Sequence, residues 1–187
     1  MHPLRRLLLA NAEVAALIFV VALVYLNSLD NAFHFDDEHS LVENPHIRQL
    51  KNIPKFFYEP QMFSRNIGSE MYRPLVLVSY ALNYHLGGYN VHGFHALNIL
   101  LHLICVVLVY RLFGVFAPDA KKWAWVLALG WGLHPLTAEP VNYISSRSES
   151  MAGLFYLAAL LFYLRKDQGI AWLSVLCFAA GLLSSQH

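Results

Sequence analysis

The sequence predicts an all-α integral membrane protein, a bundle of about five transmembrane helices with shorter helices at the membrane surface. Hydrophobic residues make up 57% of the 187 residues, charged residues only 13%, and the mean hydropathy is +0.44. An average soluble domain carries roughly 25% charged residues. The apolar residues also gather in runs comparable to the roughly 20 residues of helix that cross a bilayer. We therefore expect a single membrane domain over residues 1–187.

Five apolar segments qualify as membrane spans, although the last three are short. They are residues 7–26, 94–117, 123–136, 150–164 and 170–183. The first run follows Arg5 and Arg6, as a signal peptide would, but it exceeds the usual h-region and no clear A-x-A cleavage site follows. An uncleaved signal anchor is therefore predicted. Residues 72–84 are apolar but short and flanked by aromatic residues, so we expect them to lie at the interface or to re-enter.

Basic residues at the span ends predict which side each loop faces, because cytoplasmic loops are enriched in Lys and Arg. The basic residues fall on one side if the spans alternate, and this side is assigned to the cytoplasm: Arg5, Arg6, Lys121, Lys122, Arg165 and Lys166. A first outer loop (28–93) and a second outer loop (137–149) then face outward. They hold nine of the twelve acidic residues: Asp30, Asp36, Asp37, Glu38, Glu43, Glu59, Glu70, Glu139 and Glu149. The chemistry is therefore expected on the outer or lumenal face.

The composition also limits the kinds of partner and site. A formal net charge of +1 gives no basic field for nucleic acid, so no nucleic-acid partner is expected. Cys105 and Cys177 lie inside apolar runs, where they act as small hydrophobes, and neither a disulfide nor a zinc site is expected. Within the first outer loop, residues 47–58 are basic, aromatic and amphipathic. They suggest a helix along the membrane surface; the alternative is a solvated loop that packs on the bundle.

The densest acidic cluster is the stretch FHFDDEH, just beyond the first span. Asp36, Asp37 and Glu38 stand beside His34 and His39. Neighbouring carboxylates can bind a divalent cation, act as a general base, or simply be solvated. The residues alone do not choose among these three roles.

A polar face is predicted in the outer half of the second span. His95, Asn98 and His102 are spaced i, i+3 and i+7, so they share one side of a helix. Polar side chains at membrane depth face a bundle interior or a cavity. They either form hydrogen bonds between helices or line a cavity.

Two further places concentrate ionisable side chains near span ends. Arg73 precedes Pro74 at the start of an apolar helix, where it could reach headgroups or hold a specific phosphate. The second outer loop, HPLTAEPVNYISSRSES, is short and fixed by two prolines. Its ionisable residues are His134, Glu139, Arg147 and Glu149.

In order and spacing, these motifs resemble the membrane domain of the tetratricopeptide-type protein O-mannosyltransferases and their bacterial relatives, which have the C-type glycosyltransferase fold. The resemblance covers about 33–164 and rests on Phe33, Phe35, Asp36, Asp37, Asn44, Pro45, Tyr72, Arg73, Pro74, Leu75, Gly93, Phe94, His95, Asn98, His102, His134, Pro135, Glu139, Val141, Arg147 and Glu149. Each motif is weak alone, but six of them occur in register. The chain stops after a fifth span without tetratricopeptide repeats, so an N-terminal portion is expected.

The resemblance implies a transferase on the non-cytoplasmic face of a multi-pass membrane protein, in a bacterial inner membrane or the endoplasmic reticulum. It implies transfer of mannose or a similar hexose from a polyprenyl-phosphate donor, held by its lipid in the bilayer, to a protein or glycan hydroxyl. Asp36 and Asp37 occupy the place of the catalytic base, with Asp36 favoured, and could hold a divalent cation. Arg73, Arg147 or His134 would bind the donor phosphate. The supporting residues are His95, Asn98, His102, Glu139 and Glu149.

Two other classes of protein compete with this interpretation. A transporter or channel would use His95, Asn98 and His102 to line a polar path, but the ionisable residues cluster at one face instead of near mid-membrane. A non-catalytic membrane subunit could keep the same fold. The presence of Asp36, Asp37 and Arg147 favours the enzyme over such a subunit.

Overall fold

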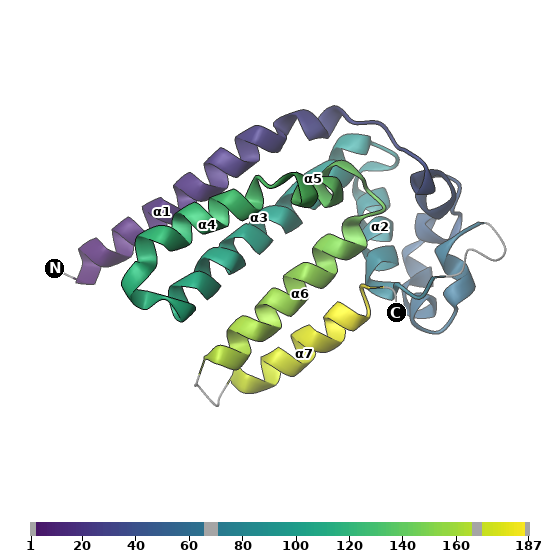
Figure 1. The fold of residues 1–187 in the computed structure, drawn as a ribbon. Coiled ribbons are helices and arrows are strands. Elements are labelled where there is room, and N and C mark those ends of the chain that lie inside the picture. The colour runs from purple at the N-terminus through teal and green to yellow at the C-terminus, as the bar shows by residue number, and fades with distance from the viewer. Residues whose placement is uncertain (1–2, 66–70, 166–169, 186–187) are drawn as a thin grey trace.

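The computed structural model describes residues 3–65, 71–165 and 170–185, and within these ranges all regular structure is helical (Figure 1). The predicted all-α class is therefore confirmed. Glu70 and Lys166, which entered the topology prediction, lie outside the described residues. The α-helices are α1 (Pro3–Tyr25), α2 (Pro74–Gly87), α3 (Val91–Phe116), α4 (Lys121–Gly132), α5 (Pro135–Asn142), α6 (Arg147–Leu164) and α7 (Ala171–Leu182).

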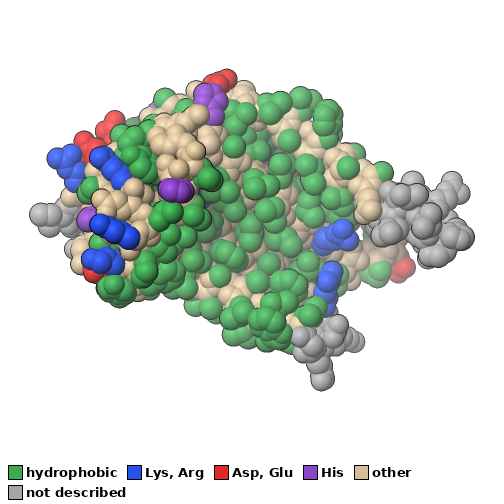
Figure 2. Space-filling view, turned by 180° about the vertical axis from the view of Figure 1, so that it is seen from behind, with side chains coloured by type: hydrophobic (Ala, Val, Ile, Leu, Met, Phe, Trp, Pro, Cys, Tyr) green, Lys and Arg blue, Asp and Glu red, His purple; other side chains and the backbone are tan. Residues whose placement is uncertain are grey.

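Among the residues that the structure describes, two helical segments are long and apolar enough to cross a membrane. Asn11–Asp30 has 20 residues with a mean hydropathy of 2.1, and Val91–Phe116 has 26 residues with 2.4. At 1.5 Å per residue, the 12 residues of α4 and of α7 reach only about 18 Å. Figure 2 shows hydrophobic side chains over the middle of the molecule, with Lys and Arg toward its two ends. These features support a membrane protein, while the count of five spans stays a prediction.

The third predicted span, 123–136, is divided in the structure. Helix α4 ends at Gly132, and α5 begins at Pro135. Proline is favourable at the first position of a helix but lacks the N–H that would continue α4. The His134 side chain then accepts a hydrogen bond from the N–H of Leu136 (3.2 Å) and caps α5. Part of the expected second outer loop is therefore a helix.

The long helices pack closely where α1, α3 and α4 meet. A Cβ atom at Gly132 would lie 2.8 Å from Cγ2 of Val106, so only glycine fits here without displacement. The carbonyl of Gly132 accepts hydrogen bonds from the Tyr25 hydroxyl (3.1 Å) and lies 2.8 Å from Nε2 of His102. Side chains of α1, α3, α4 and α5 form one apolar core around this contact.

The segment expected as an amphipathic surface helix forms 3-10 helices and not one regular α-helix. They include His46–Arg48 and Leu50–Phe57, and the second contains Pro54. The ring of Pro54 opposes a regular α-helix here. Ile47 and Phe56 are buried in a second core, formed with α2, the start of α3 and α6. The segment thus packs on the bundle, while its place at the membrane surface stays a prediction, and α2 contributes buried residues to this core.

The charge bias predicts opposite sides for the segment before α2 and the connection between α3 and α4. We replace Lys51 or Asp119, both exposed, by cysteine in a variant without Cys105 and Cys177. A membrane-impermeant maleimide should label the cysteine at 51 from the non-cytoplasmic side, and the cysteine at 119 only from the cytoplasmic side. Labelling of both from the cytoplasmic side would contradict the topology.

Candidate functional site

The acidic cluster begins in a tight turn, residues 34–37, which contains the two neighbouring carboxylates of Asp36 and Asp37. The N–H of Asp37 donates to the carbonyl of His34 (2.9 Å), and Phe35 inside this turn has φ 46°. Left-handed backbone costs roughly 1–2 kcal/mol for a residue with a Cβ atom. Phe35 is the one non-glycine residue with positive φ in the described part of the chain. The two carboxylates that follow it have different surroundings.

Asp37 is buried, with 1% of its surface exposed, and it ties the first outer loop to the second. Its Oδ1 accepts hydrogen bonds from the N–H (2.8 Å) and hydroxyl of Ser145. Its Oδ2 accepts one from the N–H of His34 (3.0 Å). Burial raises the pKa of the Asp37 carboxyl above its usual range, and the hydrogen bonds from Ser145 and His34 offset part of this rise. Asp37 is thus a structural link.

Asp36, in contrast, has 63% of its side chain exposed and lines a polar pocket. Its Oδ1 lies 3.5 Å from Nε2 of His39. Its backbone N–H donates to the hydroxyl of Tyr143 (3.0 Å), which holds the main chain against the second outer loop. Of the two aspartates, Asp36 is the one that a substrate can reach.

This pocket, which we call the polar pocket, has a volume of about 250 Å³. Its lining joins the segment before α2, the start of α2, and the residues that lead into α6. The lining residues are Asp36, His39, Ser40, Phe63, Met71, Arg73, Tyr143, Ser145, Ser146, Ser148 and Glu149. Its volume lies below the roughly 300–1,000 Å³ of drug-sized ligand sites. The polar pocket therefore suits a small polar ligand.

The polar pocket contains two features that attract an anion. Arg73 lines it with a half-buried side chain, and its guanidinium lies over the ring of Phe63 at 5.8 Å. The N-terminus of α6 also borders it, through Ser146 and Ser148. Helix N-termini carry a partial positive charge, although here the N–H groups of Arg147 and Glu149 already donate to the carbonyls of Ile144 (3.0 Å) and Ser146 (3.0 Å). Glu149, in the first turn of α6, supplies a second carboxylate to the lining.

Arg147 does not line the polar pocket, although the sequence predicted that it would bind the donor phosphate. Its side chain is 0% exposed. It donates hydrogen bonds to Asn98 (2.7 Å), Ser79 (3.0 Å), Asn83 (2.8 Å) and the carbonyl of Phe94 (2.9 Å). All three guanidinium nitrogens therefore donate to groups inside the protein. We therefore revise its role from phosphate binding to holding α2, α3 and α6 together.

The polar face of α3 forms hydrogen bonds between elements. Asn98 donates to the carbonyls of Pro140 (3.2 Å) and Tyr143 (3.3 Å), in addition to accepting from Arg147. Nε2 of His95 lies 3.1 Å from the carbonyl of Asn31. His102, already described beside Gly132, stacks on Trp131, with ring centroids 5.5 Å apart. This arrangement matches the hydrogen-bonding alternative and weakens the case for a polar path.

The remaining predicted residues lie elsewhere. His134 caps α5, and neither it nor Glu139 is part of the pocket lining. In residues 3–65, 71–165 and 170–185, no group of three or more His, Cys, Asp or Glu side chains could hold a metal ion. A cation bound by Asp36 and Asp37 stays a prediction. Sequence reasoning assigned no role to Tyr143 or to the serines around Arg147. The run SSRSES was the signal for the serines.

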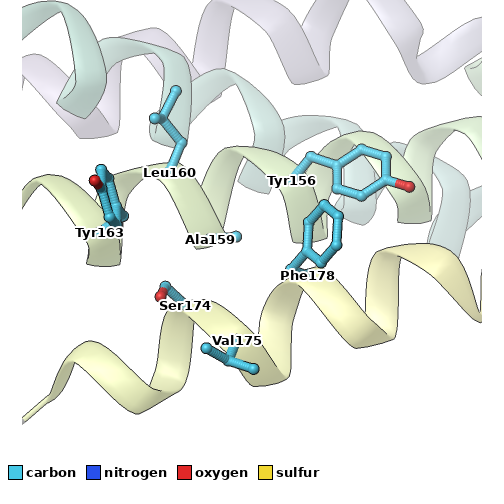
Figure 3. A pocket seen from close by; sticks show the side chains of 7 residues that line it. All are labelled: Tyr156, Ala159, Leu160, Tyr163, Ser174, Val175 and Phe178. Atoms are coloured by element: carbon cyan, nitrogen blue, oxygen red, sulfur yellow. The ribbon is translucent and has the colours of Figure 1, made fainter.

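A second cavity, of about 540 Å³, lies between α6 and α7 (Figure 3). Its lining is almost entirely apolar: Tyr156, Ala159, Leu160, Tyr163, Ser174, Val175 and Phe178. It contains no charged side chain and so offers neither a carboxylate base nor a cation for a phosphate. The candidate site is therefore the polar pocket, although it is smaller.

Comparisons with known proteins find relatives along most of the chain. Protein O-mannosyl-transferase TMTC3 of Mus musculus is 30% identical over 166 residues, which are 86% of this chain and 18% of the relative. TMTC1 of Homo sapiens is 34% identical over 168 residues, 86% of this chain and 19% of the relative. Tmtc1 of Drosophila melanogaster is 31% identical over 186 residues, 94% of this chain and 21% of the relative.

The chain spans about a fifth of the length of these curated relatives. No family model matches it, and no solved structure matches it. The chain is homologous to tetratricopeptide-type protein O-mannosyltransferases over most of its length, which confirms the resemblance inferred from its motifs.

The different surroundings of Asp36 and Asp37 predict different effects of the same substitution on stability. In Asp37→Asn, one carboxylate oxygen becomes an NH₂ group. That group cannot accept the hydrogen bond that the N–H of His34 or of Ser145 donates to Asp37. Leaving a buried donor unpaired costs roughly 1–3 kcal/mol. The apparent Tm in detergent should fall by several degrees.

Asp36→Asn is the matched control, because its exposed side chain loses little on substitution. Its apparent Tm should stay within about one degree of the wild type. Equal Tm values for the two variants would show that the link through Asp37 does not stabilise the fold.

Proposed function

We propose that the protein is a glycosyltransferase that moves mannose or a similar hexose from a polyprenyl-phosphate donor to a hydroxyl of a protein or glycan. The reaction would take place on the non-cytoplasmic face. The observation that carries this proposal is the polar pocket, in which an accessible carboxylate shares one small cavity with an arginine and a helix N-terminus. The homology to proteins named protein O-mannosyl-transferases supports the same reaction class and mannose as the sugar.

In this proposal Asp36 is the general base. Its carboxylate takes the proton of the acceptor hydroxyl while that oxygen attacks the anomeric carbon of the donor sugar. The bond from this carbon to the phosphate oxygen breaks, and the polyprenyl phosphate leaves. Attack from the side opposite the phosphate inverts the anomeric centre, by analogy with inverting glycosidases.

The leaving phosphate gains negative charge as the bond breaks, and the donors that meet this charge would be Arg73 and the N-terminus of α6. Interactions placed where charge develops lower the barrier most. The hydroxyls of Ser146 and Ser148, which line the same pocket, add hydrogen-bond donors. Glu149 would repel a phosphate, so we assign it to hydrogen bonds with sugar hydroxyls. A divalent cation at the acidic pair is not needed for any of these steps.

The position of the polar pocket suits a donor with a lipid tail. Asp36 follows the segment Asn11–Asp30, and Glu149 lies at the start of α6, so the pocket lies at the end of apolar helices. A polyprenyl chain in the bilayer would hold its phosphate near such an end, which limits the donor's freedom before reaction. The location also suits an acceptor that arrives from the aqueous side.

Substitution of the proposed base tests the function. Asp36→Asn keeps the size of the side chain but removes the proton acceptor, so turnover should fall on the order of 10²-fold or more. The assay measures transfer of radiolabelled mannose from polyprenyl-phosphate mannose to protein, in membranes from cells that express each variant. Turnover of Asp36→Asn close to that of the wild type would refute the role of the carboxylate.

Arg73→Gln serves as the companion variant. It should raise the donor KM and weaken inhibition by free polyprenyl phosphate, because one cationic phosphate ligand is lost. Arg165→Gln is the matched control, since Arg165 is exposed at the far end of α6. Its donor KM should equal that of the wild type.

A further inference from the structure

His39 faces Asp36 inside the polar pocket, and its ring has a polar partner on each side. Its Nδ1 lies 3.0 Å from the hydroxyl of Ser64, and its Nε2 lies 3.5 Å from Oδ1 of Asp36. The ring is mostly enclosed, with 22% of the side chain exposed. It is therefore held at Nδ1 and presents Nε2 to the carboxylate.

The contact at Nδ1 favours one arrangement of hydrogen atoms. When the Ser64 hydroxyl donates to Nδ1, a neutral imidazole carries its hydrogen on Nε2. Nε2, which lies 3.5 Å from Oδ1 of Asp36, is then the ring atom that can donate to the carboxylate. A separation of 3.5 Å is long for a hydrogen bond, but contacts of catalytic groups often shorten when substrate binds.

We propose that His39 is a positioning residue for Asp36, an inference that rests on the proposed function. In the complex with substrate, a hydrogen bond from Nε2 to Oδ1 would fix the rotation of the carboxylate and leave Oδ2 to receive the acceptor's proton. His39 itself neither gains nor loses a proton in this role. The groups that line the same pocket around this pair are the cation of Arg73, the carboxylate of Glu149 and the hydroxyl of Tyr143.

This arrangement differs from a purely structural role for His39. The main chain of the loop is already held, because the carbonyl of His39 accepts from the N–H of Arg65 (3.2 Å) whatever side chain stands at 39. The hydroxyl of Ser40 also donates to the carbonyl of Asp36. A structural role predicts equal damage from any polar replacement, whereas a positioning role requires a donor at the place of Nε2.

Two amide variants separate these roles. In His39→Gln the amide nitrogen can take the place of Nε2, and in His39→Asn the shorter amide can replace only Nδ1. We expect His39→Asn to lower kcat about tenfold with an unchanged donor KM. His39→Gln should keep kcat within about threefold of the wild type. Equal losses in the two variants would overturn the proposal.

The matched control is His92→Asn. His92 also faces a carboxylate, with Nε2 2.9 Å from Oδ1 of Asp30, but this pair is exposed and does not line the polar pocket. Its kcat should equal that of the wild type. The same mannose transfer assay is used throughout, and the apparent Tm of each variant is measured beside it.

The double variant Asp36→Asn/His39→Asn tests whether His39 acts through Asp36. It should be no slower than Asp36→Asn alone, since a residue that only positions the base has nothing left to position. Multiplied losses would overturn the inference. Normal turnover of Asp36→Asn would instead refute the proposed function and the inference with it, while normal turnover of His39→Asn alone would refute only the role of His39.

Discussion

The fold depends on one buried cation. Arg147 is fully enclosed, and a guanidinium removed from water is destabilising unless its N–H groups are satisfied. In the described part of the chain its hydrogen-bond partners are neutral: Ser79 and Asn83 on α2, and Asn98 and the carbonyl of Phe94 on α3. The rings of Tyr80 and Phe94 add cation–π contacts at 4.9 and 5.6 Å. These requirements fix the start of α6 against α2 and α3.

The polar pocket follows from this constraint. Because Arg147 is fixed, Ser145 just before it is placed to donate to Asp37. Asp37 in turn holds the turn that leaves Asp36 exposed, and the start of α2 brings Arg73 to the same lining. One carboxylate of the pair thus serves the fold and its neighbour serves the proposed chemistry. Adjacent residues can have such different roles because a tight turn sends their side chains in different directions.

Sequence reasoning found much of this arrangement, but only where local order suffices. It predicted the all-α class, and it selected Asp36, Arg73 and Glu149, which the structure brings to one pocket. Only the family resemblance favoured Asp36 over Asp37. The local pattern could not separate the two, since the burial of Asp37 depends on Ser145, more than a hundred positions away. It assigned Arg147 to phosphate for a similar reason: neutral partners at Ser79 and Asn83 are invisible in the local pattern SSRSES. The packing of residues 47–58 on α2 could not be predicted either, because it depends on tertiary contacts of their apolar side chains.

The substitution Arg147→Lys tests the central claim most directly, because it keeps the charge and removes the planar fork of donors. If Arg147 is a structural cation, the apparent Tm in detergent should fall by several degrees, while the donor KM of the protein that remains folded stays unchanged. Arg165→Lys, at an exposed position, should alter neither quantity. A normal Tm together with a raised donor KM in Arg147→Lys would contradict this account and return Arg147 to phosphate binding.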